Sequence, residues 1–278
     1  TLRLRELGGL VRTAGDISAG AKRNSTTADD VRQAKRLSRS LEQQIAESEL
    51  EGRRTHEDVQ PEGELIGVAH GVGLVGSGDV GEPAGLVVPI ASTVTSPLSR
   101  SGGHLAFGGG IETSAKSQTE TVGALLKGFA GDLIASRDVH IQSLVPQEAV
   151  DSEGTGAAMA VAAVSALEQI PVRQDTIIIG GITVNGEVRA VRGVTQKIEA
   201  AVDAGYRRAV LPMTNKSDVL LNPSYRTKVE IIHVSHLVDV LDHVLVGPKR
   251  GPLLTRLQET YSKVRRQSNG HAVAKVKK

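Results

Sequence analysis

The sequence predicts an α/β fold, in which mixed strands and helices form one large domain behind a small all-helical segment. Strand-like segments alternate with helix-like segments from residue 64 to about 245. Aromatic residues make up only 2% of the 278 residues, so the core must consist of Ala, Val, Leu and Ile, which interlock closely where helices lie on sheets. The first 50 residues show helical spacing alone. A chain of this length suits one large or two ordinary domains.

Composition excludes several classes of protein. The chain has no cysteine, so it has no disulfide framework and no thiolate metal site, which fits a reducing cytoplasm. Its formal charge of +2 does not by itself call for a nucleic-acid partner. The longest apolar run, residues 157–164, is far shorter than the roughly 20 residues that a bilayer requires, and the N-terminus lacks an apolar signal core. We therefore expect no membrane segment in this chain.

Residues 1–52 are predicted to form helices, and the charged stretch 53–62 a linker. The segment from Thr26 to Leu50 places apolar residues at helical spacing: Val31, Ala34, Leu37, Leu41 and Ile45. Thr27 and Asp30 suit the cap and the first turn of this helix. Because the sequence begins inside a helical pattern, we expect it to be the C-terminal part of a longer protein.

The α/β region is predicted to span residues 63–247. Strands are expected at 64–75, 84–96, 138–145, 208–212 and 229–234, and helices at about 112–134, 193–206 and 235–245, with a short one near 215–221. An Ala-rich helix is also expected within 153–175, immediately after a turn of small residues. Within 175–191, the pair Asn185-Gly186 predicts a hairpin because both residue types accept left-handed turn conformations.

The last segment, residues 248–278, is predicted to be a basic tail. From Lys249 to Lys278 it carries nine Lys or Arg against one Glu. Such a segment is typical of a solvated or partly helical tail, or of one that contacts nucleic acid or an acidic partner.

Several patterns resemble functional motifs without meeting their requirements. Residues 71–76 match the dinucleotide fingerprint, but the following Gly- and Pro-rich stretch cannot start the helix that would face a pyrophosphate, so a β-turn or bulge is expected. No Gly-Lys dipeptide is present, and hence no P-loop. His56 and Glu57 are not followed by the second histidine of a zinc-binding helix. The position of His140 is more typical of a strand histidine that lies near a site than of a metal ligand. We expect no metal and no cofactor bound by this chain.

One lysine lies in an unusual position on its helix. In the segment 193–206, Lys197 is at the edge of the apolar stripe formed by Val194, Ile198 and Ala201. Its amine either extends to water or is held in an apolar cleft. Burial disfavours the charged form of an amine, and a neutral lysine would be a plausible general base.

The same segment carries a resemblance to a known family. "GVTQKIEAAVDAG" followed by "AVLP", and preceded by "SALEQIPVRQD" and "ITVNGEV", resembles the proteolytic domain of Lon proteases, especially the archaeal-type LonB group. "LRLRELGGLVRTAGDI" resembles the small helical lid subdomain of the AAA+ module that precedes it. The resemblance implies an ATP-dependent endopeptidase that forms hexameric rings and degrades unfolded proteins by a Ser-Lys dyad. ATP and Mg²⁺ would bind the AAA+ core outside this chain, with Arg3 a candidate nucleotide sensor. A membrane anchor, if present, would lie upstream and place the domain on the cytoplasmic face.

Carried over residue by residue, the resemblance makes Lys197 the dyad lysine and places the nucleophilic serine's position at Gly154. Ile179 stands where the family has a threonine that hydrogen-bonds the lysine, and Arg192 stands at the first of two glycines. A neutral lysine needs acceptors to orient it and a hydroxyl to deprotonate, and neither Gly nor Ile supplies them.

Two functions remain open from the sequence. In the first, the chain is the protease part of an ATP-dependent peptidase, which either uses a substitute nucleophile, Thr155 or Ser152, or is an inactivated version of an active parent. A one-residue shift near a helix start rotates a side chain by about 100°, so Thr155 would point away from Lys197. In the second, the chain is a Lon-like pseudoprotease that serves as a ring scaffold or as a binding or remodelling module.

Overall fold

The computed structural model describes residues 4–37, 60–75, 83–97, 103–108, 113–144, 150–151 and 153–261. The positions of Arg3, His56, Glu57 and Ser152 and the tail from residue 262 onward lie outside these ranges. The predicted α/β class is confirmed by a mixed sheet with helices on both faces. Among the described residues, no helix combines the length and the hydropathy of a membrane span.

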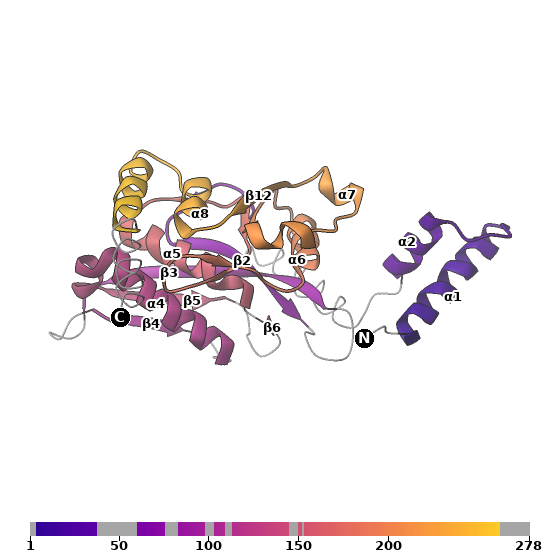
Figure 1. Ribbon diagram of the computed structural model, residues 1–278, viewed down its shortest axis with the longest axis horizontal. Helices are drawn as coiled ribbons and strands as arrows, with labels where there is room; N and C mark the ends of the chain where they lie inside the picture. Colours follow the sequence, from indigo (N-terminus) through magenta and orange to yellow (C-terminus); the bar gives the residue numbers. More distant parts are fainter. Residues whose placement is uncertain are drawn as a thin grey trace, which may run out of the picture.

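The N-terminal part is a helical hairpin of α1 (Leu4–Gly20) and α2 (Ala28–Leu37), which pack on each other (Figure 1). The predicted cap of α2 is confirmed: the Thr27 N–H donates to the Asp30 carboxylate at 2.7 Å, and the Asp30 N–H donates to Thr27 Oγ1 at 3.4 Å. Of the predicted apolar stripe, Ala34 is buried but Val31 and Leu37 are exposed, because α1 covers only one narrow side of α2.

The large domain is built on an eight-stranded sheet. Its order is β12 (Glu230–Val234), β11 (Arg208–Pro212), β8 (Thr176–Ile178), β2 (Val68–Val75), β3 (Ala84–Thr95), β5 (Asp138–Ser143) and β4 (Leu105–Gly108), with β6 (Val150–Asp151) also paired to β2. Four pairs of neighbouring strands are parallel: β12–β11, β11–β8, β8–β2 and β4–β5. Strand β3 is antiparallel to both of its neighbours, β2 and β5.

Two short antiparallel pairs flank this sheet. They are β1 (Glu64–Leu65) with β7 (Val172–Arg173), and β9 (Gly181–Ile182) with β10 (Val188–Arg189). The second pair is the hairpin predicted from Asn185-Gly186. Gly186 has a positive φ of +83°, whereas Asn185 does not have a positive φ, so only the glycine adopts the left-handed conformation that was expected of both residues.

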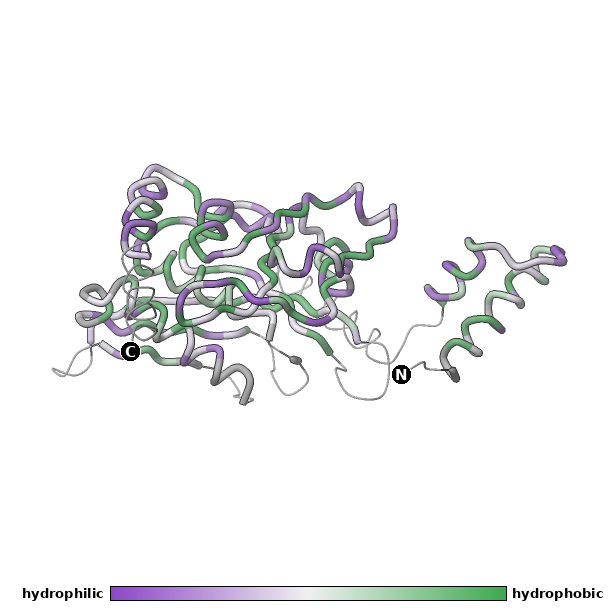
Figure 2. The backbone as a smooth tube through the Cα atoms, viewed as in Figure 1, coloured by the Kyte–Doolittle hydropathy of each residue, from purple (hydrophilic) through white to green (hydrophobic). Residues whose placement is uncertain are grey.

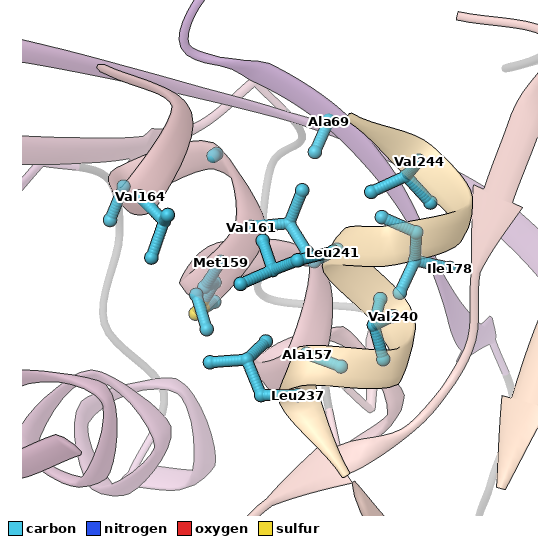
Figure 3. Close-up of a cluster of buried hydrophobic side chains, with 14 of the residues drawn as sticks. Ala69, Ala157, Met159, Val161, Val164, Ile178, Leu237, Val240, Leu241 and Val244 are labelled. Carbon is cyan, nitrogen blue, oxygen red and sulfur yellow. The ribbon is translucent and has the colours of Figure 1, made fainter. Parts of the chain in front are cut away.

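Helices cover both faces of the sheet and create two core clusters. On one face, α6 (Val194–Asp203) packs over β2 and β3. On the other face lie α4 (Thr113–Ala135), α5 (Gly156–Glu168) and α8 (Leu237–Val244). Residues 156–167 of α5 are all buried, and Figure 3 shows side chains of α5 and α8 meeting around Val161 and Leu241. The central strands and α5 are accordingly hydrophobic in Figure 2, whereas hydrophilic residues line the outer helices.

The packed domain continues past residue 247, where the sequence predicts a basic tail. Residues 250–261 are helical, and Leu253, Leu254 and Leu257 are buried in the same cluster as α5 and α8. Ion pairs join this helix to the domain, from Arg250 to Asp242 and from Arg256 to Glu168. The first part of the predicted tail is therefore domain structure, because its leucines recur on one side of the helix.

The described part of the glycine-rich segment, residues 71–75, is not the β-turn or bulge that the sequence predicts, and Gly76 lies outside the described residues. Residues 71–75 are regular strand within β2, paired with β3. A β-carbon on Gly71 would lie 3.2 Å from the Thr155 methyl group and 3.4 Å from Ala158 Cβ, so the absent side chain allows the start of α5 to lie close to the sheet. His140 is in strand β5 as expected, with an exposed ring whose Nε2 lies 3.1 Å from Thr95 Oγ1.

Candidate functional site

The candidate site lies at one edge of β2, where the strand that pairs with this edge changes. Along the edge of β2 opposite β3, strand β8 pairs at His70, whereas β6 pairs at Leu74 and Val75. Between these two pairings the edge faces the short 3-10 turn η2 (Glu153–Thr155). The Val72 carbonyl oxygen is 2.8 Å from the point where a β-carbon on Gly154 would lie. Gly154 is therefore held against a strand edge that neither neighbouring strand occupies.

The turn at Gly154 is fixed by backbone hydrogen bonds to residue 180. The Gly180 N–H donates to the Gly154 carbonyl at 3.0 Å, and the Ala157 N–H donates to the Gly180 carbonyl at 3.0 Å. Thr155 caps α5 without a side-chain hydrogen bond to the helix. These contacts place the start of α5 beside the residue that follows Ile179.

Lys197 is on α6, which covers the face of the sheet opposite to α5, and its side chain extends to the turn at Gly154. Its side chain is only 1% exposed, so the amine is buried rather than extended to water. A β-carbon on Gly154 would lie 2.5 Å from Lys197 Nζ and 3.4 Å from its Cε. The structure thus brings together the two residues that the resemblance pairs, and the lysine amine fills the space in which a side chain at position 154 would begin.

Two glycines set the position of the lysine helix. A β-carbon on Gly85 of β3 would lie 2.6 Å from the Gln196 carbonyl, 2.8 Å from Ala200 Cβ and 3.0 Å from Lys197 Cα. Gly193, the N-cap of α6, has a φ of +62°, and a β-carbon there would lie 2.9 Å from the Leu74 side chain. Glycine at both positions lets α6 lie low enough on the sheet for Lys197 to reach Gly154.

Replacing Gly85 with alanine is expected to lower the free energy of unfolding by about 2 kcal/mol, because the new methyl group meets the backbone of α6 and forces it away from the sheet. Urea unfolding of the chain measures the change. The matched control is Gly128→Ala in α4, where a β-carbon meets nothing within 4 Å and removal of a helical glycine stabilises by up to about 1 kcal/mol. Equal stability of the Gly85 variant and the parent would contradict the proposed close contact.

A clamp that the sequence analysis missed holds the start of α6. Asn215, 2% exposed on the 3-10 helix η3 (Met213–Asp218), accepts from the Val191 N–H at 2.9 Å and donates to the Val191 carbonyl at 3.0 Å. Thr195 Oγ1 donates to the Asp218 carbonyl at 3.0 Å. The sequence shows Asn215 only as one polar residue in a turn-rich segment, so its partner could not be identified without the fold.

Three other predicted site residues lie within the described ranges: Thr155, Ile179 and Arg192. Thr155 is fully buried, and its side chain contacts the Gly71 position on the α5-facing side of β2. Ile179 is 1% exposed and belongs to the apolar cluster that includes Ile198 of α6. Arg192 is exposed immediately before Gly193. In the described part of the chain, no group of three or more His, Asp or Glu is placed to hold a metal ion.

Comparison with known proteins identifies the family of this domain. Residues 46–247 match the model of the Lon protease (S16) C-terminal proteolytic domain. The chain is 39% identical to the archaeal Lon protease of Archaeoglobus fulgidus over 260 residues, covering 93% of this chain and 41% of the relative. It is 38% identical to that of Pyrococcus abyssi, covering 94% of this chain and 26% of the relative.

A third relative, the archaeal Lon protease of Thermoplasma volcanium, is 39% identical, covering 92% of this chain and 40% of the relative. The chain thus spans less than half the length of these relatives. The match over residues 46–247 includes both Gly154 and Lys197. This chain therefore belongs to the Lon protease family and carries its C-terminal proteolytic domain.

Proposed function

We propose that this chain is the C-terminal part of an ATP-dependent endopeptidase of the archaeal Lon type whose peptidase centre has lost its nucleophile. The observation that supports this proposal is the meeting of Lys197 Nζ with Gly154, where a β-carbon would lie 2.5 Å from the amine. In this proposal Lys197 is the base of a former Ser-Lys dyad, and the residue opposite it, Gly154, has no side chain.

The chemistry of such a dyad needs a hydroxyl at that point. A serine oxygen attacks the peptide carbonyl while a neutral lysine accepts its proton and later delivers it to the leaving amine. Gly154 has no atom that can attack, and the Ile179 side chain offers no acceptor to orient the amine. Thr155 is a poor substitute because its side chain is fully buried against Gly71. We infer that the chain does not hydrolyse peptide bonds.

The remaining role of the domain is that of a ring scaffold in a polypeptide-binding or remodelling machine. In this proposal, the α1–α2 hairpin is the small helical subdomain of an AAA+ module with Arg3 as a nucleotide sensor, and ATP and Mg²⁺ bind the module's core outside this chain. The assembly is a hexameric homo-oligomer that acts on unfolded proteins in the cytoplasm or at its membrane face. The basic residues from 249 to 278 are a candidate contact for nucleic acid or an acidic partner.

Degradation of unfolded casein tests the loss of hydrolysis. The complete protein that contains this chain, supplied with ATP and Mg²⁺, is expected to release no peptides above the background set by its Lys197→Ala variant. Loss of a serine nucleophile lowers turnover by about 10⁶-fold in a well-studied protease, which makes the two proteins indistinguishable. ATP-dependent cleavage by the parent that disappears in Lys197→Ala would instead establish a substitute nucleophile, Thr155 or Ser152, and overturn the proposal.

A further inference from the structure

A histidine at the start of α8 contacts three other segments of the domain. His236 is the N-cap of α8, and its ring stands edge-on to Phe129 of α4 with centroids 6.5 Å apart. In the helix at residues 250–261, the Tyr261 ring is tilted against the histidine ring with centroids 3.9 Å apart. A β-carbon on Gly186 would lie 2.8 Å from two atoms of the histidine ring, so the ring also covers the turn of the β9–β10 hairpin.

Two hydrogen bonds determine which nitrogen of the His236 ring carries its proton. Nε2 lies 3.0 Å from the Asn185 carbonyl oxygen, which can only accept, so Nε2 is the donor. Nδ1 accepts from the Val238 N–H at 3.3 Å, as the side chain of an N-cap residue does. Both bonds form only when the ring is neutral and its one proton is on Nε2. A second proton would be on Nδ1, would point at the Val238 N–H and would remove this bond.

Backbone hydrogen bonds join the hairpin to α8 at the same place. The Leu237 N–H donates to the Gly186 carbonyl at 2.8 Å, and the Val188 N–H donates to the Ser235 carbonyl at 2.9 Å. At its other end the hairpin begins directly after Gly180, whose backbone holds the turn of the candidate site. The hairpin therefore connects the contacts of the histidine with the candidate site.

The groups around the ring determine its response to acid. Asp239 of α8 accepts from the His236 backbone N–H at 3.1 Å, and Glu187 of the hairpin pairs with His236 in a β-bridge. Phe129 and Tyr261 present aromatic rings, which are uncharged in neutral and mildly acidic solution. Burial of the ring lowers the pKa of His236 below its usual 6.5, against the opposing effects of the hydrogen bond at Nε2 and of the two carboxylates. The ring therefore binds a proton more readily once it has left these contacts.

We propose that His236 is a pH-sensitive latch, which in its neutral form holds the β9–β10 hairpin against the start of α8 and which releases the hairpin when it is protonated. Above pH 6.5 the ring is neutral in both the closed and the open state, and the latch has its full strength. As the pH falls below 6.5, the open state binds a proton that the closed state does not, so opening is favoured. The latch is independent of the proposed loss of the nucleophile, because none of its contacts involves Gly154 or Lys197.

Amide hydrogen exchange of the 278-residue chain tests the latch, because it measures how often each N–H leaves its hydrogen bond. The reporter groups are the N–H groups of Leu237 and Val188, which join the hairpin to α8. After correction for intrinsic exchange rates, their protection is expected to fall by about 3- to 25-fold between pH 7 and pH 5, where the upper figure is the limit for a closed state that binds no proton.

His236→Asn removes the titrating group and keeps the cap, because asparagine is among the best N-cap residues. Its shorter side chain is expected to lose the bond to the Asn185 carbonyl. At pH 7 the protection of the reporter groups should therefore be about 2- to 10-fold lower than in the parent, which is the range for one hydrogen bond. It should then be the same at pH 5 as at pH 7.

His70→Leu is the matched control for acid sensitivity elsewhere in the domain. His70 is another buried histidine, whose pKa burial lowers to about 4, and it makes none of the contacts of the latch. The reporter groups of this variant are expected to respond to acid as those of the parent do.

Equal protection of the reporter groups at pH 7 and pH 5 in the parent would overturn the latch. A fall in His236→Asn as large as that in the parent would assign the acid response to other groups and would overturn it as well. A smaller fall in His70→Leu than in the parent would mean that the hairpin opens only when the whole domain unfolds, which also contradicts the proposal. The proposed function is judged separately, by casein cleavage.

Discussion

Placing a serine at Gly154 is expected to give this chain weak peptidase activity, about 10²-fold below that of the double variant Gly154→Ser/Ile179→Thr. The new β-carbon would lie 2.5 Å from Lys197 Nζ, the far end of a flexible side chain, which can withdraw and then hydrogen-bond the new hydroxyl. The Val72 carbonyl, 2.8 Å away, belongs to a strand and yields less easily. The strain is expected to lower the free energy of unfolding by about 1–3 kcal/mol.

The second substitution addresses the orientation of the amine. Residue 179 precedes Gly180, whose N–H donates to the Gly154 carbonyl, so a hydroxyl at position 179 would lie beside the dyad. A correctly positioned general base contributes about 10²- to 10⁴-fold to a rate, and we expect at least the lower figure to depend on this acceptor.

Cleavage of a short unstructured fluorogenic peptide, which needs no unfolding step, measures both variants of the chain. Adding Lys197→Ala to the double variant is the control and should abolish its activity. Circular dichroism checks that each variant is folded, because Ile179 lies in the apolar cluster around α6 and a buried hydroxyl destabilises. A single variant as active as the double would show that Ile179 does not limit the site. A folded but inactive double variant would place the defect outside residues 154 and 179.

The sequence predicted those parts of the fold that depend on local chemistry. The alternation of strands and helices, the Asn185-Gly186 hairpin and the Thr27 cap are all read from residues close together in the chain, and all are present. Burial of Lys197 was one of two alternatives, since a helix pattern alone does not show what covers its edge. The fold resolves this by placing α6 directly on β3 at Gly85.

Features that depend on contacts between distant segments were missed or wrong. Gly71 was predicted to form a turn, whereas its lack of a side chain allows Thr155, at the end of η2, to lie close to β2. Spacing along β2 does not reveal this contact. The clamp from Asn215 to Val191 likewise joins two segments far apart in the sequence, η3 and the loop before α6. The charge of the C-terminal segment obscured its leucines, which pack against α5 and α8.

Acid is expected to destabilise the domain through His70. This histidine is 3% exposed on β2, and its ring stands edge-on to Tyr206 with centroids 5.4 Å apart. Its Nδ1 is buried without a hydrogen-bond partner among the described residues. Burial lowers the pKa of His70 from its usual 6.5 to about 4, because the protonated ring would carry an uncompensated charge into the core.

The direction of the pH effect follows from the protonation of His70 in the folded and in the unfolded chain. Above pH 6.5 His70 is neutral in both the folded and the unfolded chain, so its titration takes nothing from the free energy of unfolding. As the pH falls from 6.5 toward 4, the unfolded chain binds a proton that the folded chain does not, so the free energy of unfolding decreases by about 1.4 kcal/mol per pH unit. Over this window His70 alone accounts for a loss of about 3 kcal/mol.

Urea unfolding at pH 7 and pH 4 of the chain and of His70→Leu separates this contribution from those of other groups, such as His236, whose pKa is also lowered by burial. The leucine variant is expected to lose about 3 kcal/mol less stability than the parent between the two pH values. At pH 7 its stability should equal or exceed that of the parent, since an unpaired buried nitrogen is replaced by an apolar group. Gln142→Leu, at an exposed position on β5 that does not titrate, serves as the control and should lose as much as the parent. Parallel losses in His70→Leu and the parent would mean that the folded chain admits the proton at His70, and that water reaches this side of β2.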